Sequence, residues 1–137
     1  VLYRIAGSPE VEGTAGFSDV SENAYYYKAI VWAVANGIAK GHVDGTFRPY
    51  EDISRQDLAV FFFRFAQYQE YDVSGRTDLS KYEDSSAISA YALDAVQWAV
   101  NAGLINGVSS TSLAPKTSAT RGTIAVVSHR YCTTLGN

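Results

Sequence analysis

Apolar side chains recur at helical spacing in several segments of the chain, and polar loops rich in glycine, serine and aspartate separate these segments. In residues 26–34 the apolar positions lie three and four apart, and Gly37 follows where a helix C-cap is expected. Residues 58–65 show the same stripe, and Ser54 precedes them where an N-cap is expected. The pattern predicts amphipathic helices joined by long loops, without strands.

The pair of predicted helices occurs twice. Shifting the chain by 66 positions aligns residues 25–41 with residues 91–107, and the same shift aligns Arg55 with Arg121. A fixed period of this length indicates an internal repeat. Each helical pair is too small to bury its apolar stripe alone, so we expect the repeats to share one core.

The opening residues are interpreted as the end of an earlier copy, because "VLYRIAG" aligns with "FFFRFAQ" at residues 61–67. The expected organisation is therefore the tail of a preceding repeat at residues 1–12, one repeat at residues 13–70, and a second, degenerate repeat with its leading linker at residues 71–137. The expected fold class is all-α, a helical repeat that is cut within its first copy.

An arginine opens the second helix of each repeat, although the positive end of the helix dipole disfavours a cation there by about 0.3–1 kcal/mol. Arg55 follows Ser54, and Arg121 follows Thr120, which is the expected N-cap of the corresponding helix. Unpaired N–H groups at a helix start, together with a guanidinium, form a site for a carboxylate or a phosphate. The alternative is a structural ion pair between Arg55 and a nearby acidic residue, and the residues alone leave both interpretations open.

Composition excludes several classes of function. The net charge is −3 and the basic residues are scattered, which argues against a nucleic-acid partner, and no apolar run is long enough to insert into a membrane. Cys132 is the only cysteine, so neither an internal disulfide nor a Cys-x-x-Cys metal site can form. His42 and His129 have no aligned nucleophile. We expect no catalysis, no metal and no cofactor.

Short motifs in both repeats resemble those of the S-layer homology (SLH) domain family. The first repeat carries "FSDV", "GIAKG", "DGTFRP" and "ISRQD", with Tyr25 as the aromatic residue before the first helix. The second keeps "YED", "GLING" and "ATR". It departs from the family where "SSTSLAP" replaces the loop sequence and "RGT" follows the arginine, so the turn and the binding role of this repeat stay open.

The resemblance implies a pseudo-threefold helical spindle, here truncated, that holds a secreted protein on the bacterial cell surface without a covalent link. The implied partner is a secondary cell-wall polysaccharide, anionic and often bearing a pyruvate ketal, bound in grooves between adjacent repeats. The residues that the resemblance implies in glycan binding are Arg55, Arg121, Asp19, Asp84, Tyr25, Tyr91, Gly41 and Gly107.

Alternative interpretations stay open for some of these residues and for the whole chain. An aspartate before a helix is typical of a cap, so Asp19 and Asp84 have a structural alternative. Trp32 and Trp98 are expected to pack between helices rather than against sugars. The repeats could also form a protein–protein interaction or spacer module without a glycan site. An apolar seam at the cut first repeat would allow a homodimer.

Overall fold

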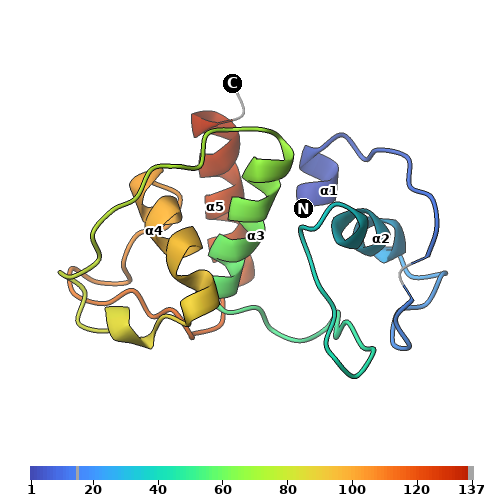
Figure 1. Cartoon of the computed structure of the whole chain (residues 1–137), viewed down its shortest axis with the longest axis horizontal. Coiled ribbons are helices and arrows are strands. Elements are labelled where there is room, and N and C mark those ends of the chain that lie inside the picture. Colours follow the sequence, from blue (N-terminus) through green and yellow to red (C-terminus); the bar gives the residue numbers. More distant parts are fainter. Residues whose placement is uncertain (15, 136–137) are drawn as a thin grey trace. The chain divides into compact units, whose positions relative to one another are not determined.

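The computed structural model describes residues 1–14 and 16–135, which form helices joined by long loops (Figure 1). No strand occurs in these ranges, where Ser54 and Ser118 form an isolated antiparallel bridge. The all-α fold class is therefore confirmed. In chain order the elements are α1 (Leu2–Ile5), α2 (Tyr27–Ala35), α3 (Arg55–Tyr68), the 3-10 helices η1 (Ser85–Ala87) and η2 (Ala90–Ala92), α4 (Leu93–Asn101) and α5 (Arg121–Thr134).

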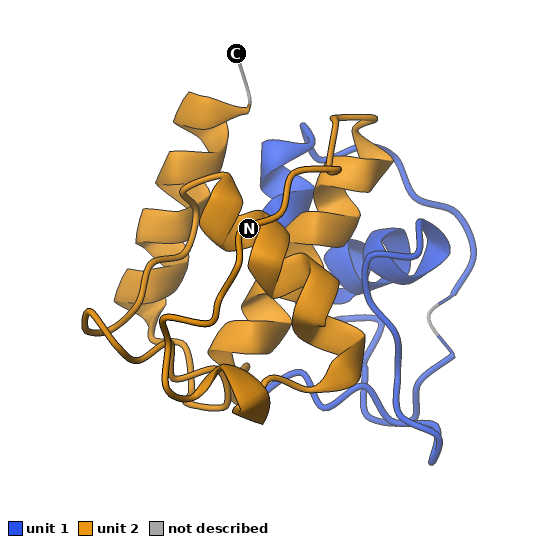
Figure 2. Cartoon of the chain, turned by 60° about the vertical axis from the view of Figure 1, so that its left-hand side comes forward, with its two compact units in different colours: residues 1–51 blue, residues 52–137 orange. Residues whose placement is uncertain are grey.

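The chain divides into two compact units, which we call unit 1 (Val1–Glu51) and unit 2 (Asp52–Asn137) (Figure 2). The boundary falls between the two helices of the first sequence repeat. Unit 2 therefore joins α3, from the first repeat, to α4 and α5 from the second. The repeat boundaries inferred from the sequence and the pseudo-threefold spindle stay predictions, and each unit is described by itself.

Aromatic side chains of α3 form the core of unit 2 with α4 and α5. Phe62 and Phe65 are buried, and their ring centroids lie 5.3 and 5.4 Å from that of Tyr131 on α5. Trp98 of α4 is 2% exposed and meets the ring of Phe63 edge-on at 5.6 Å. Because large aromatic side chains contribute most to core stability, the packing of helices from successive repeats supplies the core, as the sequence predicts.

The short helix α1 packs against α2 in unit 1. The ring of Tyr3 on α1 meets that of Trp32 on α2 edge-on, with 5.6 Å between centroids. Trp32 is 3% exposed. Both tryptophans of the chain therefore pack between helices, which confirms the expectation from the sequence and leaves neither ring available to a ligand.

Glycine ends the first helix of both repeats in the same way. Gly37 follows α2 and Gly103 follows α4, with φ of +72° and +77°. The N–H of Ile38 donates to the carbonyl of Ala33 at 2.8 Å, and the corresponding bond spans the second glycine at 2.9 Å. These bonds define a Schellman motif, which needs a left-handed residue after the C-cap. The predicted C-cap is confirmed, and it fixes where each loop begins.

Candidate functional site

The start of α3 lies against the loop of the second repeat, residues 106–117. The main-chain N–H groups of Arg55 and Gln56 donate to carbonyls of this loop at 2.9 and 2.8 Å. The N–H of Asp57 donates to the hydroxyl of Ser54 at 3.2 Å, which confirms the predicted N-cap. The first three N–H groups of α3 are thus bonded within the protein, and the prediction of an anion site built on free N–H groups at this helix start is wrong.

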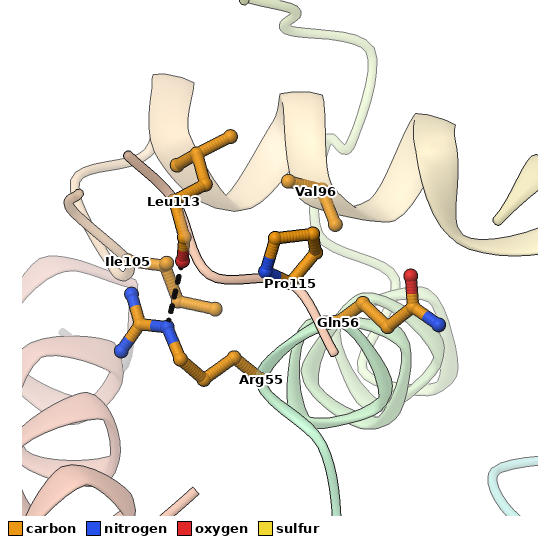
Figure 3. Close-up of a pocket in the computed structure, with 6 residues that line it drawn as sticks. All are labelled: Arg55, Gln56, Val96, Ile105, Leu113 and Pro115. Atoms are coloured by element: carbon orange, nitrogen blue, oxygen red, sulfur yellow. Dashed lines mark hydrogen bonds between the residues drawn. The ribbon is translucent and has the colours of Figure 1, made fainter. Parts of the chain in front are cut away.

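The guanidinium of Arg55 reaches across the same loop (Figure 3). Its Nε donates to the carbonyl of Leu113 at 2.9 Å, and its Nη2 donates to the carbonyl of Asn106 at 2.7 Å. Among the described residues Arg55 forms no ion pair, so the structural role takes the form of bonds to backbone carbonyls. Burial lowers the pKa of Arg55, and the charge of Asp84 opposes part of that shift.

An open groove runs beside Arg55 in unit 2, and we call it the Arg55 groove. Its walls are Arg55, residues 104–108 after α4, and one face of α5 that includes Val126 and Arg130. Its empty volume is about 480 Å³, including the solvent at its mouth. Val108 and Val126 are 60% and 46% exposed. The groove therefore combines apolar surface with two arginines.

A smaller pocket lies on the other side of the same helix start. In Figure 3 the side chains of Arg55 and Gln56 leave the first turn of α3 in different directions, and apolar side chains of α4 and the loop fill the space between them. This pocket offers a ligand little polar chemistry beyond what already bonds within the protein. Its lining consists of Arg55, Gln56, Val96, Ile105, Leu113 and Pro115.

Gln56, which the sequence does not single out, ties the start of α3 to the start of the next helix. It is 5% exposed, and its side-chain carbonyl accepts the N–H of Ser89 at 3.0 Å. Its amide nitrogen donates to the hydroxyls of Ser89 and Tyr91 at 3.0 and 3.3 Å. The hydroxyl of Tyr91 donates in turn to Asp57 at 2.5 Å. A polar residue in the first turn of a helix gives no sequence signal of such burial.

The two tyrosines implied in glycan binding keep ring surface in solvent. Tyr91 is 61% exposed, and Tyr25, in unit 1, is 87% exposed. Partial burial and the bond to Asp57 raise the pKa of Tyr91. The ring of Tyr25 meets that of Tyr26 edge-on at 5.2 Å, and Tyr26 meets Tyr50 at 5.7 Å. Exposed tyrosine rings of this kind can cover the apolar face of a sugar.

Asp19 and Asp84 each hold the loop of their own repeat. The two carboxylate oxygens of Asp19 accept the N–H groups of Phe47 and Arg48 at 2.8 and 2.7 Å. Asp84 accepts the corresponding pair of N–H groups in the second loop at 2.9 and 2.8 Å. The bond from Phe47 is the main cause that lowers the pKa of Asp19, and the bond from Leu113 does the same for Asp84.

The alternative that these two aspartates cap the following helices is wrong. Asp84 occupies the N-cap position of η1 but its side chain accepts no cap hydrogen bond there, and α2 begins after Tyr26 without a side-chain cap. Both carboxylates instead bind main-chain N–H groups about 30 residues further along the chain. Because the same two bonds occur in both repeats, we call these aspartates loop clamps, meaning residues whose carboxylate holds the loop of its own repeat in place.

The second loop keeps part of the turn of the first despite its different sequence. The N–H of His42 donates to the carbonyl four residues on at 2.8 Å, and the N–H of Val108 does the same at 2.8 Å. Arg48 and Ala114 occupy corresponding positions, and both adopt a left-handed φ, of +59° and +50°. Such a conformation is strained for residues other than glycine. The tip of the turn differs, because Gly45 has φ +83° and its N–H donates to the carbonyl of His42 at 3.1 Å, whereas Thr111 at the corresponding position has no left-handed φ. The sequence left the turn of this loop open, and the structure shows that its two ends are kept and its tip is not.

Gly41 and Gly107 are required by close packing. A Cβ on Gly41 would overlap the ring of Phe17, which opens the first repeat. A Cβ on Gly107 would lie 2.8 Å from the carbonyl oxygen of Ser112 and 2.8 Å from the ring of Tyr82. Gly107 also lines the Arg55 groove. Both glycines thus allow the loop to approach the aromatic residue that opens its repeat.

Arg121 lies apart from the Arg55 groove. It begins α5 and is exposed, and in the described part of the chain no hydrogen bond or ion pair involves its side chain. Thr120 caps α5 by accepting the N–H of Thr123 at 3.0 Å, which confirms the predicted cap. In unit 2 the implied residues Arg55 and Gly107 line the groove, and Asp84 clamps the adjoining loop.

Two absences hold for residues 1–14 and 16–135. No group of three or more histidine, cysteine, aspartate or glutamate side chains is arranged to hold a metal ion. None of the helices there has both the length and the apolar character needed to cross a membrane.

Comparison with known proteins identifies both repeats. The model of the family described as "S-layer homology domain" matches residues 16–59 and 81–125. The chain is 33% identical over 124 residues to the Surface-layer 125 kDa protein of Lysinibacillus sphaericus, and 38% identical over 95 residues to an endoglucanase of Bacillus sp. (strain KSM-635). It is 33% identical over 132 residues to Exoglucanase XynX of Acetivibrio thermocellus.

These three matches cover most of this chain but little of each relative. They span 88%, 69% and 93% of the chain, and 10%, 10% and 12% of the respective relatives. The chain therefore corresponds to about a tenth of the length of the proteins it resembles. The names of two of these relatives describe enzymes, of which the matched part is a small fraction.

Proposed function

The chain belongs to the S-layer homology domain family, and we propose that it anchors a larger protein to the bacterial cell wall by binding a wall polysaccharide in the Arg55 groove. Family membership and the surface-layer relative indicate a place at the bacterial cell surface. SLH repeats are binding modules, so the enzyme names of two relatives describe other parts of those longer proteins. We therefore propose no catalytic activity for this region.

One observation carries the proposal, namely the position of the Arg55 guanidinium. It lines the groove, and its two bonds to loop carbonyls use two of the five N–H donors of an arginine. The remaining donors suit a carboxylate, which forms short, charge-assisted bonds with arginine. A pyruvate ketal carries a carboxylate and a methyl group on one carbon. The methyl group would find apolar surface at Val108 and Val126.

The other residues implied by the family divide into two proposed roles. The exposed tyrosines would cover sugar rings, and Arg121 would contact acidic groups from the start of α5. The clamping aspartates and the packing glycines would act through the shape of the loops. The carboxylates of the aspartates already accept hydrogen bonds within the protein, and the glycines lie too close to neighbouring atoms to carry a side chain that could contact a ligand. The direct set is Arg55, Arg121, Tyr25 and Tyr91, and the indirect set is Asp19, Asp84, Gly41 and Gly107.

Co-sedimentation with purified cell-wall sacculi tests the proposal. The sacculi come from a bacterium that carries a pyruvylated wall polysaccharide, and they are used before and after chemical removal of that polysaccharide. We expect the chain to bind intact sacculi and to lose binding to stripped ones. Arg55→Ala should weaken binding at least about tenfold, since a charge-assisted bidentate bond contributes more than 1.4 kcal/mol.

The matched control is Lys116→Ala, which removes one positive charge from an exposed side chain outside the groove. It should bind like the unaltered chain, and circular dichroism should show that both variants are folded. Equal binding to stripped and intact sacculi would contradict the proposal. A lack of binding to intact sacculi would favour the alternative, a protein-interaction or spacer module. Light scattering at high protein concentration tests the separate homodimer prediction.

A further inference from the structure

We infer that the Arg55 groove holds two anionic groups of its glycan at once, one at Arg55 and one at Arg130. The ligand of this site is then a glycan segment with two acidic substituents rather than one. This inference rests on the proposed function, because it assumes that the groove is the glycan site. It adds a binding residue on α5 that is absent from the residues implied by the family resemblance, although an arginine recurs at the corresponding position of the first repeat.

Arg130 lines the same groove as Arg55 but comes from a different element. Its Nη1 donates to the carbonyl of Leu104 at 3.3 Å, which is long for a hydrogen bond of this type. That bond uses one of its five N–H donors. Among the described residues no carboxylate forms an ion pair with either arginine. Two guanidiniums therefore face one groove without a carboxylate of the described chain within ion-pair distance.

A short stretch of backbone brings the two arginines together. Arg130 bonds the carbonyl of Leu104, and Arg55 bonds the carbonyl of Asn106. Two residues along a chain separate Cα atoms by at most about 7 Å. The guanidiniums are thus anchored on neighbouring carbonyls of one loop. A ligand with two anionic groups on neighbouring sugars could therefore contact both guanidiniums at once.

The face of α5 in the groove is long enough for more than one sugar ring. Thr123, Val126 and Arg130 lie on this face, at spacings of three and four residues. The seven residue steps from Thr123 to Arg130 cover about 10 Å along the helix axis. Val126 and Val108 supply exposed apolar surface in the same groove. This arrangement suits neighbouring acidic sugars better than a single small anion.

The chain offers an internal comparison for Arg130. Arg64 occupies the corresponding position on α3, 66 residues earlier, and does not line this groove. A conserved structural requirement of the repeat would act on both arginines. A role in glycan binding would concern Arg130 alone. Substitution of each arginine in turn therefore separates a structural explanation from a binding one.

Calorimetric titration with polysaccharide fragments tests the inference. The fragments are released from the wall, sized to a few sugars, and separated by anion exchange into singly and doubly charged pools. We expect the unaltered chain to bind the doubly charged pool at least about tenfold more tightly, as one further charge-assisted contact would give. Arg130→Ala should remove that preference, with a much larger loss of affinity for the doubly charged pool than for the singly charged one. Arg130→Lys should keep most of the preference, because it keeps the charge.

Arg64→Ala and Lys116→Ala are the controls, and both should keep the preference for the doubly charged pool. If Arg130→Ala binds both pools as the unaltered chain does, or weakens both equally, the inference is overturned while the proposed function stands. If the unaltered chain binds neither pool, the proposed function fails as well, and the two failures are distinguishable. Should Arg130→Ala not fold, Arg130→Lys and Arg130→Gln give the same comparison with the helix and the stem of the side chain retained.

Discussion

Two helices of unit 2 begin with an arginine and yet meet different surroundings. At the start of α3, the N–H groups of Arg55 and Gln56 are bonded to the loop of the second repeat, and the Arg55 guanidinium bonds two of its carbonyls. At the start of α5, Arg121 and Gly122 are exposed, and the described part of the chain gives them no such loop. The side chain of Arg55 is therefore held by hydrogen bonds, whereas no hydrogen bond holds that of Arg121 in the described part of the chain.

The difference shows that the role of a helix-start arginine depends on the loop that lies against it. The helix dipole disfavours a cation at both starts. At α3 the loop carbonyls accept the donors of Arg55, and the following residues, Gln56 and Asp57, reach Ser89 and Tyr91. At α5 the corresponding residues are glycine and threonine, which have no donor or carboxylate of that reach. We call the start of α3 docked, because it bonds the loop of the second repeat, and the start of α5 undocked. The two starts differ in the contacts of their first three residues.

The largest effect is expected where a substitution pushes the loop away from α3. Gly107→Ala would place a methyl group 2.8 Å from the Ser112 carbonyl oxygen and from the ring of Tyr82. We expect a loss of about 1–3 kcal/mol in the free energy of unfolding, as for other overpacked sites. Urea denaturation measures it. Gly122→Ala, at the undocked start, meets only Thr120 at 3.7 Å and should instead stabilise by about 0.4–1 kcal/mol.

If both glycine variants were equally stable, the loop would have no fixed place against Tyr82, and the difference between the two helix starts would not hold. The unfolding transition should also remain cooperative in both variants, because the aromatic core around Tyr131 lies on the far turns of α3 and α5. A change in the slope of free energy against urea would indicate that more than the loop had changed.

A smaller effect is expected from removal of the arginines themselves. Arg55→Ala takes away two hydrogen bonds to carbonyls of Leu113 and Asn106 and should cost about 1–2 kcal/mol. Arg121→Ala removes an exposed side chain from the unfavourable end of a helix dipole and should change stability by no more than about 0.5 kcal/mol. Chemical denaturation of the two variants side by side measures the difference, and equal losses would contradict the comparison.

The sequence predicts the elements of this fold better than the contacts between them. Helical periodicity and the caps at Gly37, Ser54 and Thr120 depend on residues close together in the chain, and the structure confirms them. The loop that bonds the start of α3 contributes main-chain carbonyls from about 60 residues away. A carbonyl is present at every residue, so no side-chain pattern marks those that will accept a bond.

The two clamping aspartates illustrate the same limit. Asp19 and Asp84 precede helices, and local rules therefore favour caps. Their partners are instead two N–H groups in the loop, one of which belongs to a left-handed residue, Arg48 or Ala114, that is not glycine. The repeat itself was the available signal, because both aspartates precede a similar loop by a similar distance. Arg130 recurs as Arg64 in the first repeat, but the repeat alone does not separate a structural arginine from a binding one, and its place in the groove follows only from the structure.

The smallest effect on stability is expected from substitution of Tyr91, whose hydroxyl bonds residues at the docked start of α3. In Tyr91→Phe the hydrogen bonds with Asp57 and Gln56 are lost from an exposed site, so the loss of stability should stay below about 1 kcal/mol. The pKa of Tyr91 is raised in the folded state. The contribution of its hydroxyl to the free energy of unfolding is therefore fully present below the unfolded-state pKa of about 10, and it is lost as the pH rises through the folded-state pKa. The stability difference between Tyr91→Phe and the unaltered chain should thus shrink above about pH 10. Tyr25→Phe, at an 87% exposed ring, should leave the free energy of unfolding unchanged at neutral pH, and a loss equal to that of Tyr91→Phe would mean that the bond to Asp57 is not its cause.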